Sequence, residues 1–223
     1  YAAALIIKLI LPEADLQMII IVFAIISASY TIPGGLSSAI NAELIQAIIL
    51  ILGSVILTIF CFQQGGDYFY GLFADGDMLV KLIRPLSDSA TPWLGLIVGM
   101  PILGIYFWAN NQTLVQRVLS SRNIDEGRKG VIFTGYLTLL TLFIVAMPGL
   151  IARHLFPGLE KPDMVYPNMV LQLMPIGLLG VMLSALLSAL TSTLSAILNS
   201  TSTLFTIDFY AKFNKKADSK HLV

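Results

Sequence analysis

The chain has 223 residues, of which 57% are hydrophobic and only 12% are charged, and its formal net charge is zero. About a quarter of the residues of an ordinary soluble domain are charged, so this composition excludes that class. Basic and acidic residues are equal in number, so the composition does not indicate nucleic-acid binding. Cys61 is the single cysteine, which excludes a disulfide within the chain.

Six apolar segments follow one another along the chain, and a helix needs about 20 apolar residues to cross a bilayer. The segments are too long and too uniformly apolar for membrane strands, in which apolar residues alternate over about ten positions. The sequence therefore predicts an all-α integral membrane protein. The six segments are 1–11, 16–31, 39–63, 91–112, 130–152 and 174–206.

The first segment, 1–11, is too short to span a bilayer, because ten helical residues reach only about 15 Å. We therefore expect the chain to begin within a transmembrane helix and to be the central fragment of a longer protein. The second segment is followed by Ile-Pro-Gly-Gly at 32–35, a combination that predicts a turn.

Glu43, in the third segment, is the only acid well inside an apolar stretch. An ionised carboxylate at membrane depth costs about 3 kcal/mol on insertion scales, so intramembrane acids are candidates for function. Glu43 also lies about one turn from the predicted inner end of its segment, from where it can reach the interface. Both interpretations stay open at this point.

The fourth segment combines helix-weakening residues with aromatic ones. Gly95, Gly99, Pro101 and Gly104 precede the aromatic residues at 106–108. One interpretation is a helix that is interrupted at membrane depth and lines a cavity, with its aromatic side chains facing a ligand. The other is an ordinary kink next to a belt of interfacial aromatic residues.

The sixth segment carries a stripe of polar residues that recur every three or four positions, which places them on one face of a helix. Such hydroxyls often bond to the carbonyl one turn earlier in their own helix. Alternatively, neutral oxygens on one face coordinate a hard cation such as sodium, which must leave again in each cycle. The stripe consists of Ser184, Ser188, Ser192, Ser195, Asn199, Ser202 and Thr206.

The charges of the loops predict the orientation of one transmembrane domain, 1–223. Cytoplasmic loops concentrate Lys and Arg, which assigns the loop 113–129 and the tail 207–223 to the cytoplasm. The more acidic loop 64–90 is then extracellular, with a short surface helix around Met78–Ile83. The cations of the cytoplasmic regions are Arg117, Arg122, Arg128, Lys129, Lys212, Lys215, Lys216 and Lys220.

Four stretches resemble the sodium/solute symporter family, most closely its sodium/sugar cotransporter branch. They are TIPGGLSSAINAELIQ (31–46), YFWANNQTLVQRVLSS (106–121), GYLTLLTLFIVAMPGLIAR (135–153) and LMPIGLLGVMLSALLSALTSTLSAILNSTSTLFTIDFY (173–210). The resemblance covers essentially the whole chain. It implies a LeuT-like fold of five-plus-five inverted repeats, in which the six segments are core helices three to eight.

The resemblance also implies two sodium sites. The first lies against the first core helix and uses the Ala189 carbonyl with the hydroxyls of Ser192 and Thr193. A possible second site uses Glu43, where the family usually has Asp, and Ser195. At Ala196 the family has a further hydroxyl that this chain lacks.

For the substrate, the resemblance implies contacts from Gly104, Phe107, Trp108 and Thr138. Sugar carriers of the family often have a polar residue, Tyr, Trp and Lys at these four positions. Losing groups that bond sugar hydroxyls changes specificity strongly, so the symporter family is a firmer expectation than the sugar.

We therefore expect a sodium-coupled symporter of the plasma membrane, surrounded by lipid and completed by flanking helices of the same protein. Its coupling ion is Na+, its substrate is a small organic solute such as a sugar or polyol, and it is not an enzyme. The alternatives are a symporter for an amino acid, sialic acid or a carboxylate, or a symporter-like sensory domain of a larger signalling protein.

Overall fold

The structure is a computed structural model that describes residues 6–8, 10–81, 83–159 and 162–214. Every regular element in these residues is a helix, which confirms the predicted all-α class. The chain divides into two compact units, and each is described by itself. One comprises residues 1–50 with 180–223, and the other comprises residues 51–179.

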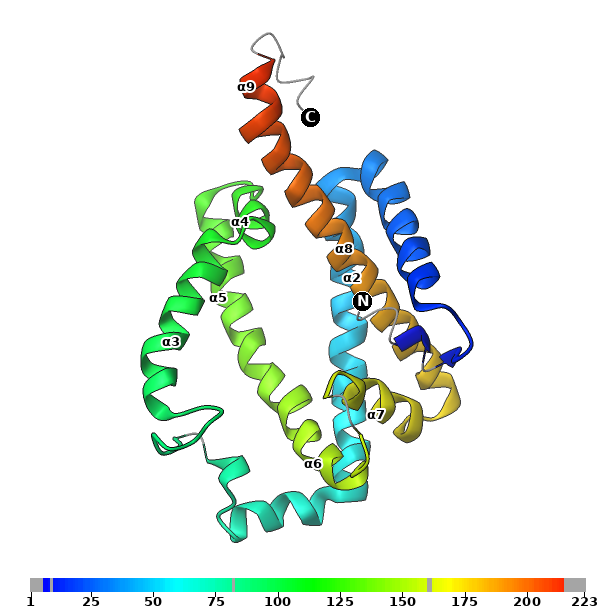
Figure 1. The fold of residues 1–223 in the computed structure, drawn as a ribbon, viewed down its shortest axis with the longest axis vertical. Coiled ribbons are helices and arrows are strands. Elements are labelled where there is room, and N and C mark those ends of the chain that lie inside the picture. The colour runs from blue at the N-terminus through cyan, green and yellow to red at the C-terminus, as the bar shows by residue number, and fades with distance from the viewer. Residues whose placement is uncertain (1–5, 9, 82, 160–161, 215–223) are drawn as a thin grey trace. The chain divides into compact units, whose positions relative to one another are not determined.

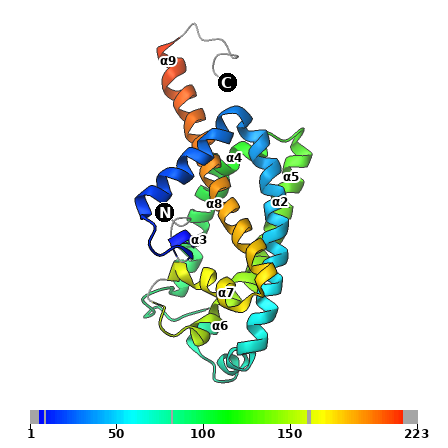
Figure 2. The same cartoon turned by 90° about the vertical axis from the view of Figure 1, so that its right-hand side faces the viewer.

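The longest element, α2 (Leu16–Ala74), remains helical through Pro33 and Gly34. The predicted end of a helix at 32–35 is therefore wrong. Proline removes one backbone N–H and crowds the carbonyl one turn earlier, which kinks a helix without having to end it. Figures 1 and 2 both show the ribbon of α2 bending back on itself in the blue, N-terminal part of this element.

Helix α2 also extends to Ala74, so the first part of the predicted loop 64–90 is helical. The predicted short helix in the same loop is present as η1 (Met78–Val80). Farther along, the carboxylate of Asp88 accepts hydrogen bonds from the amides of Ala90 and Thr91 at 2.9 and 2.8 Å. These amides, that of Thr91 first, hold the pKa of Asp88 below its usual value.

The fourth predicted segment forms α3 (Trp93–Ile105), which continues without a break into the π-helical η2 (Tyr106–Asn110). The glycines and Pro101 therefore do not interrupt the helix. The irregularity lies one turn later, where the Asn111 amide donates to the Tyr106 carbonyl at 3.0 Å, five residues back. Single π-helical turns of this kind occur frequently at functional sites.

Figure 1 shows the chain continuing from α3 through α4 (Gln112–Leu119) and returning along α5 (Ile124–Thr141). The π-helical η3 (Leu142–Ala146) and α6 (Met147–Leu155) extend α5. The stretch 113–129, which the sequence predicts as a loop, therefore consists largely of helix.

Two further elements complete the path, and the sequence analysis missed the first. It is α7 (Val165–Leu173), which follows η4 (Pro162–Met164). The second is α8 (Ile176–Phe205), which continues into η5 (Thr206–Tyr210) and α9 (Ala211–Phe213). Helix α8 confirms the predicted sixth segment.

The core of the 51–179 unit lies where α2 meets α6 and α7. A Cβ atom at Gly65 would overlap the side chain of Ile151, so the close approach of α2 to α6 requires glycine there. One turn later the rings of Tyr68 and His154 stack with centroids 4.4 Å apart. Leu57, Ile151, Met169 and Val170 are fully buried in this core.

Five helical segments in the described part of the chain, two of them within α2, are long and apolar enough to cross a membrane. They correspond to predicted segments two to six. Most of the predicted first segment, 1–11, lies outside the described residues. The predicted extracellular and cytoplasmic sides stay predictions. The five candidate spans are Leu16–Gly34, Glu43–Ala74, Trp93–Asn110, Ile124–Leu155 and Ile176–Phe213.

Candidate functional site

The polar stripe of α8 is buried only in its middle. Ser192 is 5% exposed and Ser195 is fully buried. Near the two ends, the exposed Ser184 and Ser202 donate to carbonyls of their own helix, those of Gly180 and Asn199, at 2.8 and 2.9 Å. Bonding within the helix therefore explains the ends of the stripe, and the middle of the stripe contacts another segment.

That other segment is α2. The Ser192 hydroxyl donates to Oε1 of Glu43 at 2.8 Å, across 149 positions of sequence. Glu43 is half-buried, and its carboxylate is bonded to α8 rather than only directed to the interface. Of the two interpretations of Glu43, this contact favours the functional one.

Ser195 pairs with a residue that the sequence analysis did not select. Its Oγ lies 2.5 Å from Oγ1 of Thr31, which also donates to the Ser27 carbonyl at 2.5 Å. Nearby, the Thr191 carbonyl accepts from Ser27 Oγ at 3.2 Å and from the Tyr30 hydroxyl at 3.0 Å. We call this group the oxygen cluster; its side chains are Ser27, Tyr30, Thr31, Glu43, Ser192 and Ser195.

The sequence does contain a signal for the missed residues. Ser27, Tyr30 and Thr31 belong to the polar run Ser-Ala-Ser-Tyr-Thr at 27–31, which ends an otherwise apolar segment. Because this run directly precedes the predicted turn at 32–35, the sequence alone indicates only that a helix ends there.

Of the three residues predicted for the first sodium site, Ala189 and Thr193 bond to each other, and Ser192 bonds to another helix. Thr193 is exposed, and its hydroxyl donates to the Ala189 carbonyl at 2.9 Å. Ser192 lies on the buried side of the same helix and donates to Glu43. The described residues therefore place Ser192 with the residues predicted for the second site, Glu43 and Ser195.

A pocket of about 410 Å³ lies beside the oxygen cluster. Tyr30 and Ser192 belong both to the pocket wall and to the cluster, so part of the cluster borders open space. The remaining wall residues are Phe23, Ile26, Gln46, Leu187, Ser188 and Thr191.

The predicted substrate residues lie in the 51–179 unit and are only partly brought together. The rings of Phe107 and Trp108 meet edge to face with centroids 5.5 Å apart. Trp108 lines a pocket of about 340 Å³ together with Thr134, and Thr138 donates to the Thr134 carbonyl at 2.9 Å. Trp108 therefore lies near the helical turn that carries Thr138. Gly104 and Phe107 are not among the residues that line this pocket.

Comparison with known proteins adds to this geometry. The model of the sodium:solute symporter family matches residues 1–223. Sodium/glucose cotransporter 1 of Ovis aries is 37% identical over 94% of this chain, which corresponds to 37% of that protein. Solute carrier family 5 member 4A of Mus musculus is 37% identical over the whole chain and 40% of its own length. The chain thus spans less than half the length of these relatives.

A solved structure of a Na+-coupled sialic acid symporter, in a substrate-bound outward-open state that reveals a novel Na+ site, superposes with a TM-score of 0.79. It is 22% identical, and the match covers 98% of this chain and 49% of the other. At this identity the likeness shows the fold. Together these matches confirm the predicted resemblance and the predicted membrane-transporter fold.

Proposed function

Because the chain belongs to the sodium:solute symporter family, we propose that it forms the core of a sodium-driven transporter of the plasma membrane. Sodium entering down its gradient drives the uptake of a small organic solute by alternating access between the two sides. The relatives are transporters rather than enzymes, which agrees with the expectation from the sequence.

The observation that carries this proposal is the bond between Glu43 and Ser192 within the oxygen cluster. One carboxylate and several hydroxyl oxygens form a donor set for a hard cation. A single carboxylate balances a single positive charge, whereas several carboxylates would favour a divalent ion. Glu43 is half-buried and accepts the hydrogen bond from Ser192, and a sodium ion beside its carboxylate adds an attractive charge contact.

Thr31 supplies an oxygen where this chain lacks a hydroxyl that the family usually has. The position of the missing hydroxyl is Ala196, which is buried next to Ser195 in α8. The Thr31 hydroxyl approaches Ser195 from α2 and offers a replacement oxygen. In our proposal Glu43, Ser192, Ser195 and Thr31 bind one sodium ion as cargo.

A first sodium ion binds at the Ala189 carbonyl and the hydroxyls of Ser192 and Thr193 in the same proposal. The 2.9 Å contact between Thr193 and Ala189 supports it, because both oxygens lie at one place on an exposed face of α8. Flanking helices of the same protein would cover that face. Ser192 belongs to both ligand sets, so it links the two ions.

The solute is a sugar or a polyol, which is supported by relatives described as sodium/glucose cotransporters. Trp108 provides an aromatic face for a sugar ring. Gly104, Phe107 and Thr138 offer fewer hydrogen-bonding groups than the family's sugar carriers have at these positions. The other candidates are sialic acid, which the structural relative carries, an amino acid or a carboxylate, and a sensory domain without transport.

The test is uptake by the protein at its full natural length, reconstituted in proteoliposomes. We expect Ser192→Ala combined with Thr193→Val to abolish sodium-stimulated uptake, because the pair removes both hydroxyls of the first site and one of the second. Ser184→Ala combined with Thr203→Val is the matched control, since both hydroxyls bond only to carbonyls of α8.

Unchanged sodium dependence in the Ser192 and Thr193 double variant would refute the sodium assignment. A panel of sugars, inositols, sialic acid, amino acids and carboxylates identifies the solute in the same vesicles. A folded protein that binds sodium and transports none of them would instead support the sensory alternative.

A further inference from the structure

A pocket of about 600 Å³ lies where α4 leads into α5. Most of its wall is apolar and comes from Val118, Leu119, Ile124, Val131 and Ile132. This volume falls within the range of about 300–1,000 Å³ that is typical of small-molecule sites. The function proposed above makes no use of this pocket.

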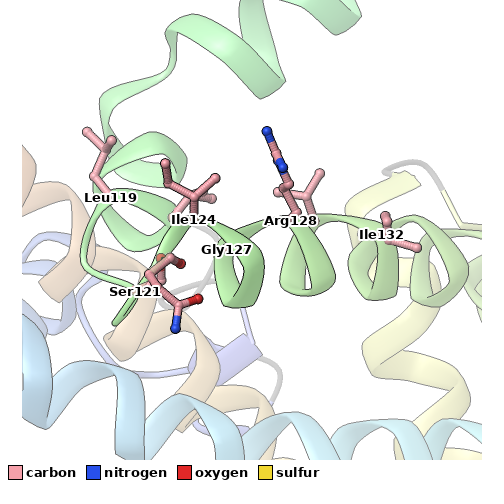
Figure 3. Close-up of a pocket in the computed structure, with 9 residues that line it drawn as sticks. Leu119, Ser121, Ile124, Gly127, Arg128 and Ile132 are labelled. Carbon is pink, nitrogen blue, oxygen red and sulfur yellow. The ribbon is translucent and has the colours of Figure 1, made fainter.

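One cation belongs to the wall of the pocket. Figure 3 shows Arg128 projecting on the same side of the hairpin as Leu119 and Ile124. Its partner Asp125 lies 3.7 Å away, and the side chains are 75% and 80% exposed. An exposed pair of this kind contributes little, so the guanidinium remains able to bind an anion.

The surroundings add to the positive charge. Residues 113–129 contain four cations, Arg117, Arg122, Arg128 and Lys129, against the two acids Asp125 and Glu126. A negative ligand is therefore attracted to this end of the helix pair, while a cation is repelled.

The position of the pocket indicates what covers its apolar wall. Ile124 begins a candidate membrane span of 32 residues, Ile124–Leu155, which is longer than the roughly 20 residues that cross the hydrocarbon core. The first turns of α5 therefore reach the boundary between hydrocarbon and headgroups. Exposed apolar side chains at that boundary contact acyl chains, and a guanidinium there meets phosphate groups.

We propose that this pocket binds one anionic phospholipid. Its acyl chain lies against Leu119, Ile124 and Ile132, and its phosphate accepts hydrogen bonds from Arg128. An Arg–phosphate contact can be bidentate, which gives it direction as well as charge. A free phosphate has no group for the apolar wall, and a zwitterionic lipid has no net charge for the basic rim. The pocket therefore selects a molecule that has both features.

Native mass spectrometry of the full-length protein tests this, after release from nanodiscs of phosphatidylcholine containing one-fifth phosphatidylglycerol. We expect preferential retention of one phosphatidylglycerol molecule. Arg128→Gln reduces that preference about fivefold, which corresponds to roughly 1 kcal/mol per basic residue at a membrane surface. Lys129→Gln is the matched control, because Lys129 is adjacent and equally charged but does not line the pocket.

A second pair of variants tests the apolar wall. Ile132→Ala reduces retention of the lipid, whereas Phe133→Ala leaves it unchanged. These neighbours on α5 are 61% and 62% exposed, and only Ile132 lines the pocket. Phe133→Ala removes a larger side chain than Ile132→Ala does. If loss of apolar surface alone caused the effect, the control would therefore show the greater loss of lipid.

Three results would overturn the proposal. Equal retention of the two lipids shows that the site does not select charge. An equal loss in the Arg128 and Lys129 variants shows a diffuse electrostatic effect without a pocket. Complete displacement of the lipid by excess soluble glycerol phosphate shows that the apolar wall contributes nothing.

Discussion

Two apolar helices carry most of the candidate ligand residues, and they present them differently. On α8, Ser192 and Ser195 are buried, and their hydroxyls bond to Glu43 and Thr31 of α2. On the helix formed by α3 and η2, Phe107 and Trp108 are 46% and 47% exposed. Their rings contact each other within that same helix.

The difference corresponds to the two ligands we propose. A small ion requires several oxygens at fixed distances, and bonds between α2 and α8 hold such oxygens in place. A solute is held over a larger area, since a typical pocket covers about 70–90% of its ligand. In our proposal the exposed aromatic rings therefore provide only part of a solute site, whereas the oxygen cluster provides most of an ion site.

The largest effect is expected for the charge in the oxygen cluster. Glu43→Gln keeps the size of the side chain and an acceptor for Ser192 but removes the charge that balances sodium. Hydrogen bonds to charged groups contribute about 1.5–3 kcal/mol, so sodium affinity should fall by tenfold or more. Equilibrium binding of radioactive sodium to the purified full-length protein measures this.

Glu126→Gln is the matched control for Glu43, because it removes an exposed acid of α5 that pairs with Lys129 at 2.8 Å. If both variants keep the affinity of the unmodified protein, Glu43 binds no sodium. If both lose it equally, the effect is one of overall charge.

The next effect concerns the contact between Ser195 and Thr31. Ser195→Ala leaves the half-buried Thr31 without one of its hydrogen bonds, at a cost of about 1 kcal/mol, so thermal stability in detergent should fall. We then compare the loss of sodium-induced stabilisation in the double variant with the sum of the losses in Thr31→Val and Ser195→Ala. The discrepancy measures the coupling of the two hydroxyls.

Ser184→Ala is the control here, because Ser184 is exposed and bonded within its own helix. It should lower neither thermal stability nor the stabilisation by sodium. Strict additivity of Thr31→Val and Ser195→Ala would mean that the two hydroxyls do not act together, and would remove Thr31 from the ion site.

A smaller effect is expected at the aromatic residues, because they provide only part of a site. A cysteine introduced at position 107 or 108 should react with a thiol reagent, and saturating solute should slow this reaction severalfold. The native Cys61 is fully buried and gives little background. Trp93→Cys is the control, at the start of the same helix. Equal protection at all three positions, or at none, would contradict a solute site at Phe107 and Trp108.

The sequence predicts the spans well because their lengths follow from a property of the bilayer. A run such as 174–206 has to be helical in hydrocarbon, where backbone groups have no other partners, and α8 confirms it. Short elements lack this constraint. Helix α7 contains Pro167, Asn168 and Gln172, so no apolar period marks it.

The site shows the same limit. Glu43 and the stripe on α8 can be selected from the sequence because a carboxylate or a row of hydroxyls is unusual in an apolar segment. Thr31 cannot, since its role depends on pairing with Ser195 across 164 positions. Such a pairing follows from how α2 and α8 pack against each other, which residue patterns do not specify.

The smallest effect is expected where directional hydrogen bonds are exposed to water. The carboxylate of Asp88 accepts two backbone hydrogen bonds. Their lengths of 2.9 and 2.8 Å are similar to the 2.8 Å bond between Ser192 and Glu43. Asp88→Asn keeps one acceptor oxygen and removes the charge, and surface changes of this kind shift stability little. We expect the melting temperature at pH 7 to fall by about 1 °C, whereas the control Asp75→Asn, at an exposed acid, leaves it unchanged.

The pH dependence of that small effect has a definite sign. Because the folded pKa of Asp88 is lowered, its charge stabilises the protein above the pKa of the unfolded chain, about 3.9. The difference between the unmodified protein and Asp88→Asn should therefore disappear as the pH falls below about 4, as followed by thermal unfolding in detergent. A difference as large as that of Ser195→Ala would show that burial is not what distinguishes the oxygen cluster from an exposed turn.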